Sequence, residues 1–333
     1  MSFLFVDENG ANINLDSNRV IVKYKNDMVK SLPIENLEAI YLFSSVQITS
    51  QCVIECLKKG INISYFSKNG AYFGRTQSTG HINVKRQRKQ AALYNSDFAL
   101  NLGKNIIKGK LNNQIVVLRR YARRSNQEID EQIKGIKISY RKIETCKTIQ
   151  ELIGYEGNAA RLYFNALALL VDKQFYFKGR SRRPPKDEFN AMLSLGYSIL
   201  MNEIYSKIEN KGLNPYFGFI HRDNEKHPTL VSDMIEEWRA VIVDSLVMSL
   251  VNGHEIFKEN FTQNEELNGY YLNKDGLKIF LNKYDNKMNT MVKYLDYVEY
   301  RTSFRKSIDL QINQLVKAIE NEDATIYEAV YLR

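Results

Sequence analysis

The chain has 333 residues, of which 44% are hydrophobic and 26% are charged, with three cysteines. This composition is ordinary for a soluble globular protein, and the length allows two domains, one of them sizeable. No apolar run approaches the roughly 20 residues that a membrane span needs, and the N-terminus lacks the basic and apolar regions of a secretory signal. Because the cysteines form no metal-ligand pattern, the sequence predicts a cytoplasmic protein with reduced thiols and no membrane partner.

The excess positive charge is concentrated in one segment. The net charge is +9 at pH 7, and residues 81–125 contain eleven Lys and Arg residues against a single acid, Asp97. Such a segment is typical of a surface that binds a polyanion, with nucleic acid as the first choice. A helix lying on a membrane surface is the competing interpretation. We disfavour it because the segment runs into a long helix with a patterned face.

Residues 1–76 are predicted to form a small β-rich domain. Four segments rich in β-branched, aromatic and other apolar residues are candidate strands. They are Phe3–Val6, Arg19–Lys25, Leu37–Phe43 and Ile61–Phe66. A short helix is expected over Thr49–Lys59, with Thr49 or Ser50 as its cap, and Lys68–Gly70 is typical of a hairpin turn before Ala71–Arg75. Residues 77–90 are the predicted linker.

Residues 91–333 are predicted to form a larger all-helical domain, which makes the fold class α+β. Apolar residues recur at helical spacing over 104–124 and continue over 151–173. Further helices are expected over 188–211, with Asp187 as the cap, and from Thr229 toward Val251. Residues 124–150 fit a helix pair or a loop and a helix, and the segment after Asn252 resembles further helices.

The stretch Gly218–Arg239 contains the first candidate site. His221 precedes a predicted helix on which Asp233 and Glu236, three residues apart, share one face. Two carboxylates and an imidazole directed at one point suit a cation that prefers oxygen ligands. A solvated acidic helix face is the alternative. A second acid, Glu156, precedes small residues that allow a close helix crossing, where an acid is more often buried and directed inward.

Eight segments between residues 33 and 240 together resemble one known family. They are Pro33–Ile40, Asn83–Gln90, Lys110–Gln114, Glu156–Phe164, Arg182–Pro185, Asn190–Tyr197, Gly212–His221 and Asp233–Arg239. Each motif alone is weak, but all eight occur in the order of the CRISPR-associated integrase family, the metal-dependent DNA integrase-endonucleases of spacer acquisition. The region after residue 255 adds little to this resemblance.

The resemblance implies a small β domain and a larger helical catalytic domain. It carries over a catalytic metal site made of Glu156, His221 and Glu236. Asp233 is a rival ligand, or it orients His221 or a metal-bound water. Family members also look like homodimers that assemble with a small ferredoxin-like partner protein, and their DNA partners are a prespacer and the repeat.

A divalent cation suits this chemistry because it can activate an attacking oxygen and stabilise a leaving oxygen. Mg²⁺ prefers carboxylates and water, and the histidine makes Mn²⁺ equally suitable. The predicted function is insertion of short DNA into a CRISPR array by 3′-hydroxyl attack on a phosphodiester, in antiviral defence. The alternatives are an inactive DNA-binding scaffold and a stand-alone nuclease or transposition-type integrase of the same fold.

Basic side chains are the candidate contacts to DNA phosphates. They are Lys85, Arg86, Arg88, Lys89 and Lys110, with Arg182 and Arg183 nearer the scissile bond. Asn190 could hydrogen-bond near the metal or equally join two helices, and Tyr163 and Tyr197 fit core packing better than DNA stacking. If several phosphates are neutralised, DNA affinity should fall steeply with salt.

Overall fold

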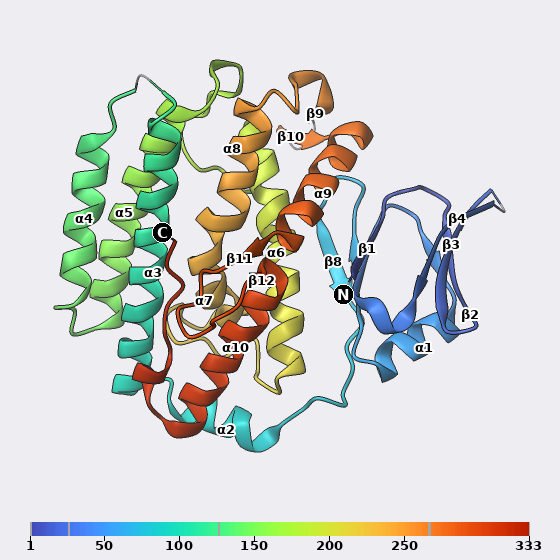
Figure 1. The fold of residues 1–333 in the computed structure, drawn as a ribbon, viewed down its shortest axis with the longest axis horizontal. Coiled ribbons are helices and arrows are strands. Elements are labelled where there is room, and N and C mark those ends of the chain that lie inside the picture. Colours follow the sequence, from blue (N-terminus) through green and yellow to red (C-terminus); the bar gives the residue numbers. More distant parts are fainter. Residues whose placement is uncertain (1, 26, 126, 266–267, 333) are drawn as a thin grey trace.

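The computed structural model describes all residues except 1, 26, 126, 266–267 and 333. A β-rich part at the N-terminal end lies beside a larger, mainly helical part (Figure 1). The fold class expected from the sequence is therefore confirmed. No helix among the described residues is both long and apolar enough to cross a membrane.

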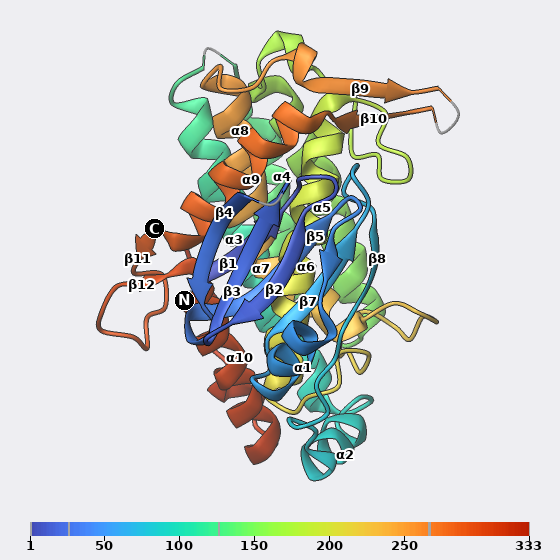
Figure 2. The same ribbon diagram turned by 90° about the vertical axis from the view of Figure 1, so that its right-hand side faces the viewer.

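Two four-stranded sheets make up the β-rich part (Figure 2). One sheet has the order β1 (Ser2–Val6), β5 (Leu37–Phe43), β7 (Asn62–Phe66) and β8 (Tyr72–Arg75). The other has the order β4 (Asp27–Pro33), β3 (Arg19–Tyr24), β2 (Asn12–Asp16) and β6 (Gln47–Ile48). Helix α1 (Ser50–Lys58) begins after Thr49, whose side chain accepts a hydrogen bond from Cys52 N, as expected for the cap.

The alternation of strand β5 explains how the two parts are joined. Successive side chains of a strand point to opposite faces of the sheet. Tyr41 and Phe43 face the core of the helical part, whereas Ile40 and Leu42 face the core between the two sheets. One strand thus contributes to both hydrophobic cores, so the β-rich part is packed onto the helices rather than connected by the linker alone.

The helical part is built from nine α-helices within the described residues. They are α2 (Val84–Ala92), α3 (Asp97–Ala122), α4 (Asp130–Ile143), α5 (Ile149–Leu170), α6 (Glu188–Asn210), α7 (Thr229–Trp238), α8 (Ser245–Asn252), α9 (Lys274–Asn289) and α10 (Phe304–Asn321). Asp187 caps α6 by accepting a 2.7 Å hydrogen bond from Asn190 N, as predicted. The segment 124–150 is a loop followed by a helix, the second of the two expected arrangements.

The structure differs from the sequence-based expectations in several places. Strands β2, β4 and β6 were not expected, and α2 begins at Val84, inside the predicted linker 77–90. The helix expected to run from Thr229 toward Val251 is interrupted by a π-helical turn, Arg239–Asp244, between α7 and α8. The helical part also contains two short antiparallel strand pairs, β9 (Phe261–Asn264) with β10 (Gly269–Leu272), and β11 (Met291–Val292) with β12 (Thr302–Ser303). The second part is therefore mainly helical and not all-helical.

Helix α5 does not cross its neighbours closely at Gly157, the first of the small residues that follow Glu156. A Cβ at Gly157 would have no atom within 4 Å, so no backbone approaches there. The close approach instead comes from Gly103 of α3, where a Cβ would lie 2.9 Å from Leu152 Cδ2. Glu156 is accordingly half-buried, and it faces α3 through its contact with Lys110.

Candidate metal site and nucleic-acid interface

Two of the three candidate ligands contact the ammonium group of Lys110. Helix α3 supplies Lys110, whose Nζ contacts Glu156 Oε1 of α5 and lies 2.6 Å from Glu236 Oε2 of α7. The third, His221, has its Nε2 3.9 Å from Glu236 Oε1. Residues far apart in the sequence thus place two carboxylates at one ammonium, with an imidazole beside one of those carboxylates.

Asp233 fixes the orientation of the histidine. Its carboxylate accepts hydrogen bonds from the backbone N–H groups of Phe219, Ile220 and His221, at 2.6, 3.1 and 3.0 Å. Its Oδ1 also lies 2.7 Å from His221 Nδ1. A neutral imidazole that donates its Nδ1 proton to a carboxylate presents a lone pair at Nε2. The contacts therefore favour an orienting role for Asp233 over the role of a rival ligand.

The charges at this point depend strongly on one another. Burial by itself would raise the pKa of Glu236, but the positive charges of Arg239 and Lys110, with His221, lower that pKa to about 2. Burial would lower the pKa of Lys110, but Glu236 and Glu156 outweigh it and raise that pKa. Both groups are therefore charged at neutral pH, and the ammonium compensates two acids.

The donor set fits a hard divalent cation. Two carboxylates and an imidazole nitrogen are ligand types that Mg²⁺ and Mn²⁺ accept in proteins. Oε2 of Glu236 is buried, and the Lys110 ammonium lies 2.6 Å from it. The described residues include no group of three or more acidic, His or Cys side chains already spaced to hold a metal ion. The spacing is set by the Lys110 ammonium between the two carboxylates.

A buried polar network beside the site was not predicted. Arg239 Nη1 lies 3.2 Å from Glu236 Oε1, and its guanidinium carbon is 5.4 Å from the ring centroid of Tyr197. The hydroxyls of Tyr197 and Tyr163 both donate to Asp244, that of Tyr163 at 2.7 Å. A lone acid after the apolar run 240–243 was the signal for this network, because a buried acid needs partners.

Asn190 supports this network from a distance. Its side chain is buried, and its Oδ1 accepts hydrogen bonds from Arg180 Nη1 at 2.9 Å and Ser181 N at 3.0 Å. The guanidinium carbon of Arg180 lies 5.3 Å from the ring centroid of Tyr197. Asn190 thus holds the loop before α6, and Arg180 connects it to the residues around Glu236.

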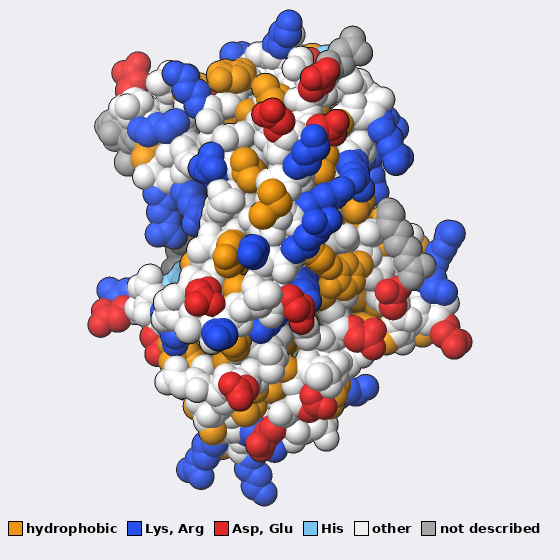
Figure 3. All heavy atoms as spheres, turned by 90° about the vertical axis from the view of Figure 1, so that its left-hand side faces the viewer, with side chains coloured by type: hydrophobic (Ala, Val, Ile, Leu, Met, Phe, Trp, Pro, Cys, Tyr) orange, Lys and Arg blue, Asp and Glu red, His pale blue; other side chains and the backbone are white. Residues whose placement is uncertain are grey.

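The basic candidates fall into different environments. Lys85 and Arg88 on α2 are exposed, as are Arg182 and Arg183. A separate group of Lys and Arg side chains gathers near mid-height on the face that carries α4 and α5 (Figure 3), two helices that contain none of these candidates. These four exposed residues remain candidates for phosphate contacts.

The other three basic candidates are engaged within the chain. Arg86 pairs with Glu320 of α10, and Lys89 Nζ lies 2.7 Å from the carbonyl oxygen of Glu320. Lys110 is 5% exposed and lies among the acids of the site, so the expectation of a surface phosphate contact does not match its position. A buried lysine is stabilised by its carboxylate partners and not by solvent.

The β-rich part, the helical part and the paired carboxylates beside an exposed basic surface together define a protein that acts on nucleic acid. Residues 4–286 match the family model described as CRISPR associated protein Cas1. The chain is 35% identical over 320 residues to the CRISPR-associated endonuclease Cas1 of Mycobacterium tuberculosis, covering 95% of this chain and 94% of that relative. The chain therefore belongs to the Cas1 family.

Solved structures agree with this assignment. A Cas1 protein from Thermotoga maritima has a TM-score of 0.82 and 25% identity, with 100% of this chain and 99% of that chain covered. One chain of a Cas6-RT-Cas1–Cas2 complex has a TM-score of 0.85 and 24% identity, with 100% of this chain and 36% of that chain covered, and it supports the fold. The family, the fold class and the function of a CRISPR-associated endonuclease and integrase in antiviral defence, as expected from the sequence, are confirmed.

Proposed function

We propose that this chain joins the 3′-hydroxyl of a short DNA to a phosphodiester of CRISPR repeat DNA, with a Mg²⁺ or Mn²⁺ ion held by Glu156, His221 and Glu236. The observation that supports this proposal best is the convergence of both glutamates on one buried ammonium, with His221 Nε2 3.9 Å from Glu236. A site that gathers two carboxylates around a positive charge is suited to a divalent cation.

When bound, the ion supplies Lewis acidity that activates the attacking oxygen and stabilises the leaving oxygen. The chain's own residues prepare the site. Asp233 holds Nδ1 of His221 so that Nε2 is free to act as a ligand. Arg239, 3.2 Å from Glu236, keeps that carboxylate charged and adds positive charge beside the position of a phosphate. Fixed positive groups near the reacting phosphate stabilise the charge that develops during the displacement.

Exposed basic residues are the proposed track for the DNA backbone. Lys85 and Arg88 on α2, with Arg182 and Arg183, have solvent-facing side chains that suit phosphate contacts. The proposed partners are prespacer and repeat DNA, a second copy of this chain and a small ferredoxin-like protein. The naming of Cas2 in one similar complex supports assembly with a further protein.

The test compares two isosteric changes on helix α5. Glu156→Gln should reduce Mg²⁺- or Mn²⁺-dependent strand joining by at least about 100-fold, because losing even a group that orients a metal ligand costs 10- to 100-fold. Glu151→Gln is the matched control, since Glu151 is exposed on the same helix and should leave joining unchanged. Unchanged joining in Glu156→Gln rejects the assignment of Glu156. Absence of joining by the unaltered chain favours an inactive scaffold, and cleaved ends without joined products favour a stand-alone nuclease.

A further inference from the structure

The segment Ala324–Leu332, which we call the C-terminal strap, runs along helix α3 (Figure 1). It begins with a 3₁₀ turn, Ala324–Ile326, after α10. It lies outside residues 4–286, the part of the chain that the family model matches. No motif predicts a functional residue in this region, and its contacts near the candidate site arise from the fold.

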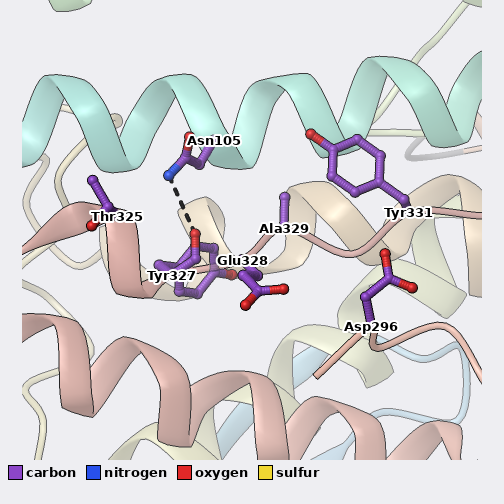
Figure 4. Close-up of a pocket in the computed structure, with 7 residues that line it drawn as sticks. All are labelled: Asn105, Asp296, Thr325, Tyr327, Glu328, Ala329 and Tyr331. Atoms are coloured by element: carbon purple, nitrogen blue, oxygen red, sulfur yellow. Dashed lines mark hydrogen bonds between the residues drawn. The ribbon is translucent and has the colours of Figure 1, made fainter. Parts of the chain in front are cut away.

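Two asparagines of α3 hold the backbone of the strap. Asn105 Nδ2 donates to the carbonyl oxygens of Ala324 and Tyr327, each at 3.2 Å, and Figure 4 shows the second of these bonds. Asn113 donates to Val330 O at 2.9 Å and accepts from Leu332 N at 2.8 Å. Side-chain amides thus bind both ends of the strap to one helix.

Packing and hydrogen bonds together hold the strap in place. Tyr327, Val330 and Leu332 are buried in the core of the helical part. A cavity of about 360 Å³ also borders the strap, lined in part by Asn105, Tyr327 and Tyr331 (Figure 4). Gly109 of α3 allows a close approach, because a Cβ there would lie 3.0 Å from the Cβ of Ala329 and 3.3 Å from Val330 O.

The strap reaches the helix that presents the candidate ligand Glu236. The next residue of α7, Glu237, is fully buried, and its Oε2 accepts hydrogen bonds from Tyr327 Oη at 3.2 Å and from Val330 N at 3.4 Å. Asn113 Nδ2 also donates to the backbone oxygen of Glu237, at 3.0 Å. The strap and α3 therefore grip α7 immediately beside Glu236.

The same two helices make the contacts of the candidate site. Successive residues of an α-helix point about 100° apart, so Glu236 and Glu237 face different neighbours. Glu236 contacts Lys110 of α3, and Glu237 contacts Asn113, one turn further along α3, together with the strap. A shift of α7 that follows loss of the strap would consequently change the separation of Glu236 from Lys110.

We propose that the C-terminal strap is a positioning element that sets α7 against α3 and so aims Glu236 at Glu156 and His221. Tyr327 and Glu237 are the positioning residues, and they act through Glu236 without touching the reacting atoms. The role in catalysis rests on the proposed function, in which Glu236 is a ligand. The link between the strap and α7 does not rest on the proposed function, because it is made entirely of contacts within the chain.

The test uses two matched hydroxyl deletions in the full chain. Tyr327→Phe removes the bond to Glu237, whereas Tyr331→Phe removes a hydroxyl of the same strap whose hydrogen bond goes to Tyr140. Tyr327→Phe should lower kcat for strand joining about tenfold, because small misplacements remote from the chemistry cost up to 10²-fold. Its DNA affinity should stay within about twofold, since the strap holds none of the proposed phosphate contacts.

Two further readouts are independent of strand joining. Trp238, the single tryptophan of the chain, is buried next to Glu237, so its fluorescence should shift in Tyr327→Phe. Mn²⁺ affinity, titrated without DNA, should weaken by about tenfold, the size of effect seen for groups that orient ligands. Tyr331→Phe should change neither. Equal effects of both variants, or unchanged fluorescence and Mn²⁺ affinity in Tyr327→Phe, would overturn the proposed positioning role of the strap. Loss of the Glu156 assignment alone would not affect the fluorescence result.

Discussion

Replacing Lys110 with methionine tests whether its ammonium compensates the two acids of the candidate site. Methionine keeps much of the aliphatic volume of lysine but leaves Glu236, which is 3% exposed, with Arg239 as its remaining cationic partner. Breaking a buried ion pair costs about 3–5 kcal/mol. Because Arg239 remains and Glu156 is partly exposed, we expect the lower end, about 3 kcal/mol.

The assay is thermal unfolding of the full chain with and without Mn²⁺. A loss of about 3 kcal/mol should lower Tm by roughly 4 °C in a chain of this size, because the entropy of unfolding is about 2.1 cal/mol/K per residue. The matched control is Lys108→Met on the same helix. Lys108 pairs with the exposed Glu144, and exposed pairs contribute less than about 1 kcal/mol. If Lys110→Met and Lys108→Met unfold at the same temperature without metal, the reasoning about compensation is wrong.

Mn²⁺ should then stabilise the Lys110→Met protein more than the unaltered one. The added cation takes over the role of the lost ammonium and has no lysine to displace. At a concentration 100 times its Kd, a ligand that binds the native state contributes about 2.7 kcal/mol, enough to recover most of the loss. A Lys110→Met protein that Mn²⁺ does not stabilise would contradict the metal site while leaving the compensation result valid.

Three further predictions follow from the contacts of the site and of α2. Burial lowers the pKa of His221, but its hydrogen bond to Asp233 and the nearby negative charges outweigh this and raise the pKa above its ordinary value. A metal ligand must be neutral, so strand joining should begin to fall above pH 6.5 as the pH is lowered. In Asp233→Asn, the pH at which joining falls should be lower, and joining itself should weaken by 10- to 100-fold. If a pH–rate profile shows this fall at an unchanged pH, His221 is not the group that causes it. Replacing Lys85 and Arg88 with glutamine should reduce the slope of log affinity against log salt by about 2, measured by fluorescence anisotropy of a labelled duplex. Arg86→Gln should instead lower Tm with little change in slope, because Arg86 pairs with α10, and equal slopes for all these proteins would argue against α2 as a DNA contact.

Local patterns in the sequence were sufficient to predict most of the fold. The strand at 37–43 and the cap at Asp187 follow from alternation and side-chain chemistry that act over a few residues. The π-helical turn Arg239–Asp244 does not, because its apolar residues fit an ordinary helix and the interruption accompanies the burial of Asp244 between two tyrosines. The strand pair β9–β10 was missed because its polar residues carry little alternation.

The helix face that carries two of the proposed site residues was easier to predict than its surroundings. Asp233 and Glu236 are three residues apart, so their shared face is a property of the helix itself. Lys110 was placed on the surface because most lysines in a basic segment are solvated. Its contact with Glu156, 46 residues away, depends on how α3 packs against α5, and that packing is not encoded in any short pattern.

The π-helical turn has a consequence for how the chain tolerates changes in length. A π turn contains one residue more than an α turn. The side chains of α8 therefore point in directions that are rotated relative to those of an uninterrupted α-helix with the same sequence. Forcing the same residues into regular α-helical winding would turn either Glu236 or the buried face of α8 away from its neighbours, by about 100°. Deleting one residue within Arg239–Asp244 would instead remove the extra residue of the π turn, so α7 and α8 would keep their orientations and both the site and the core would keep their geometry.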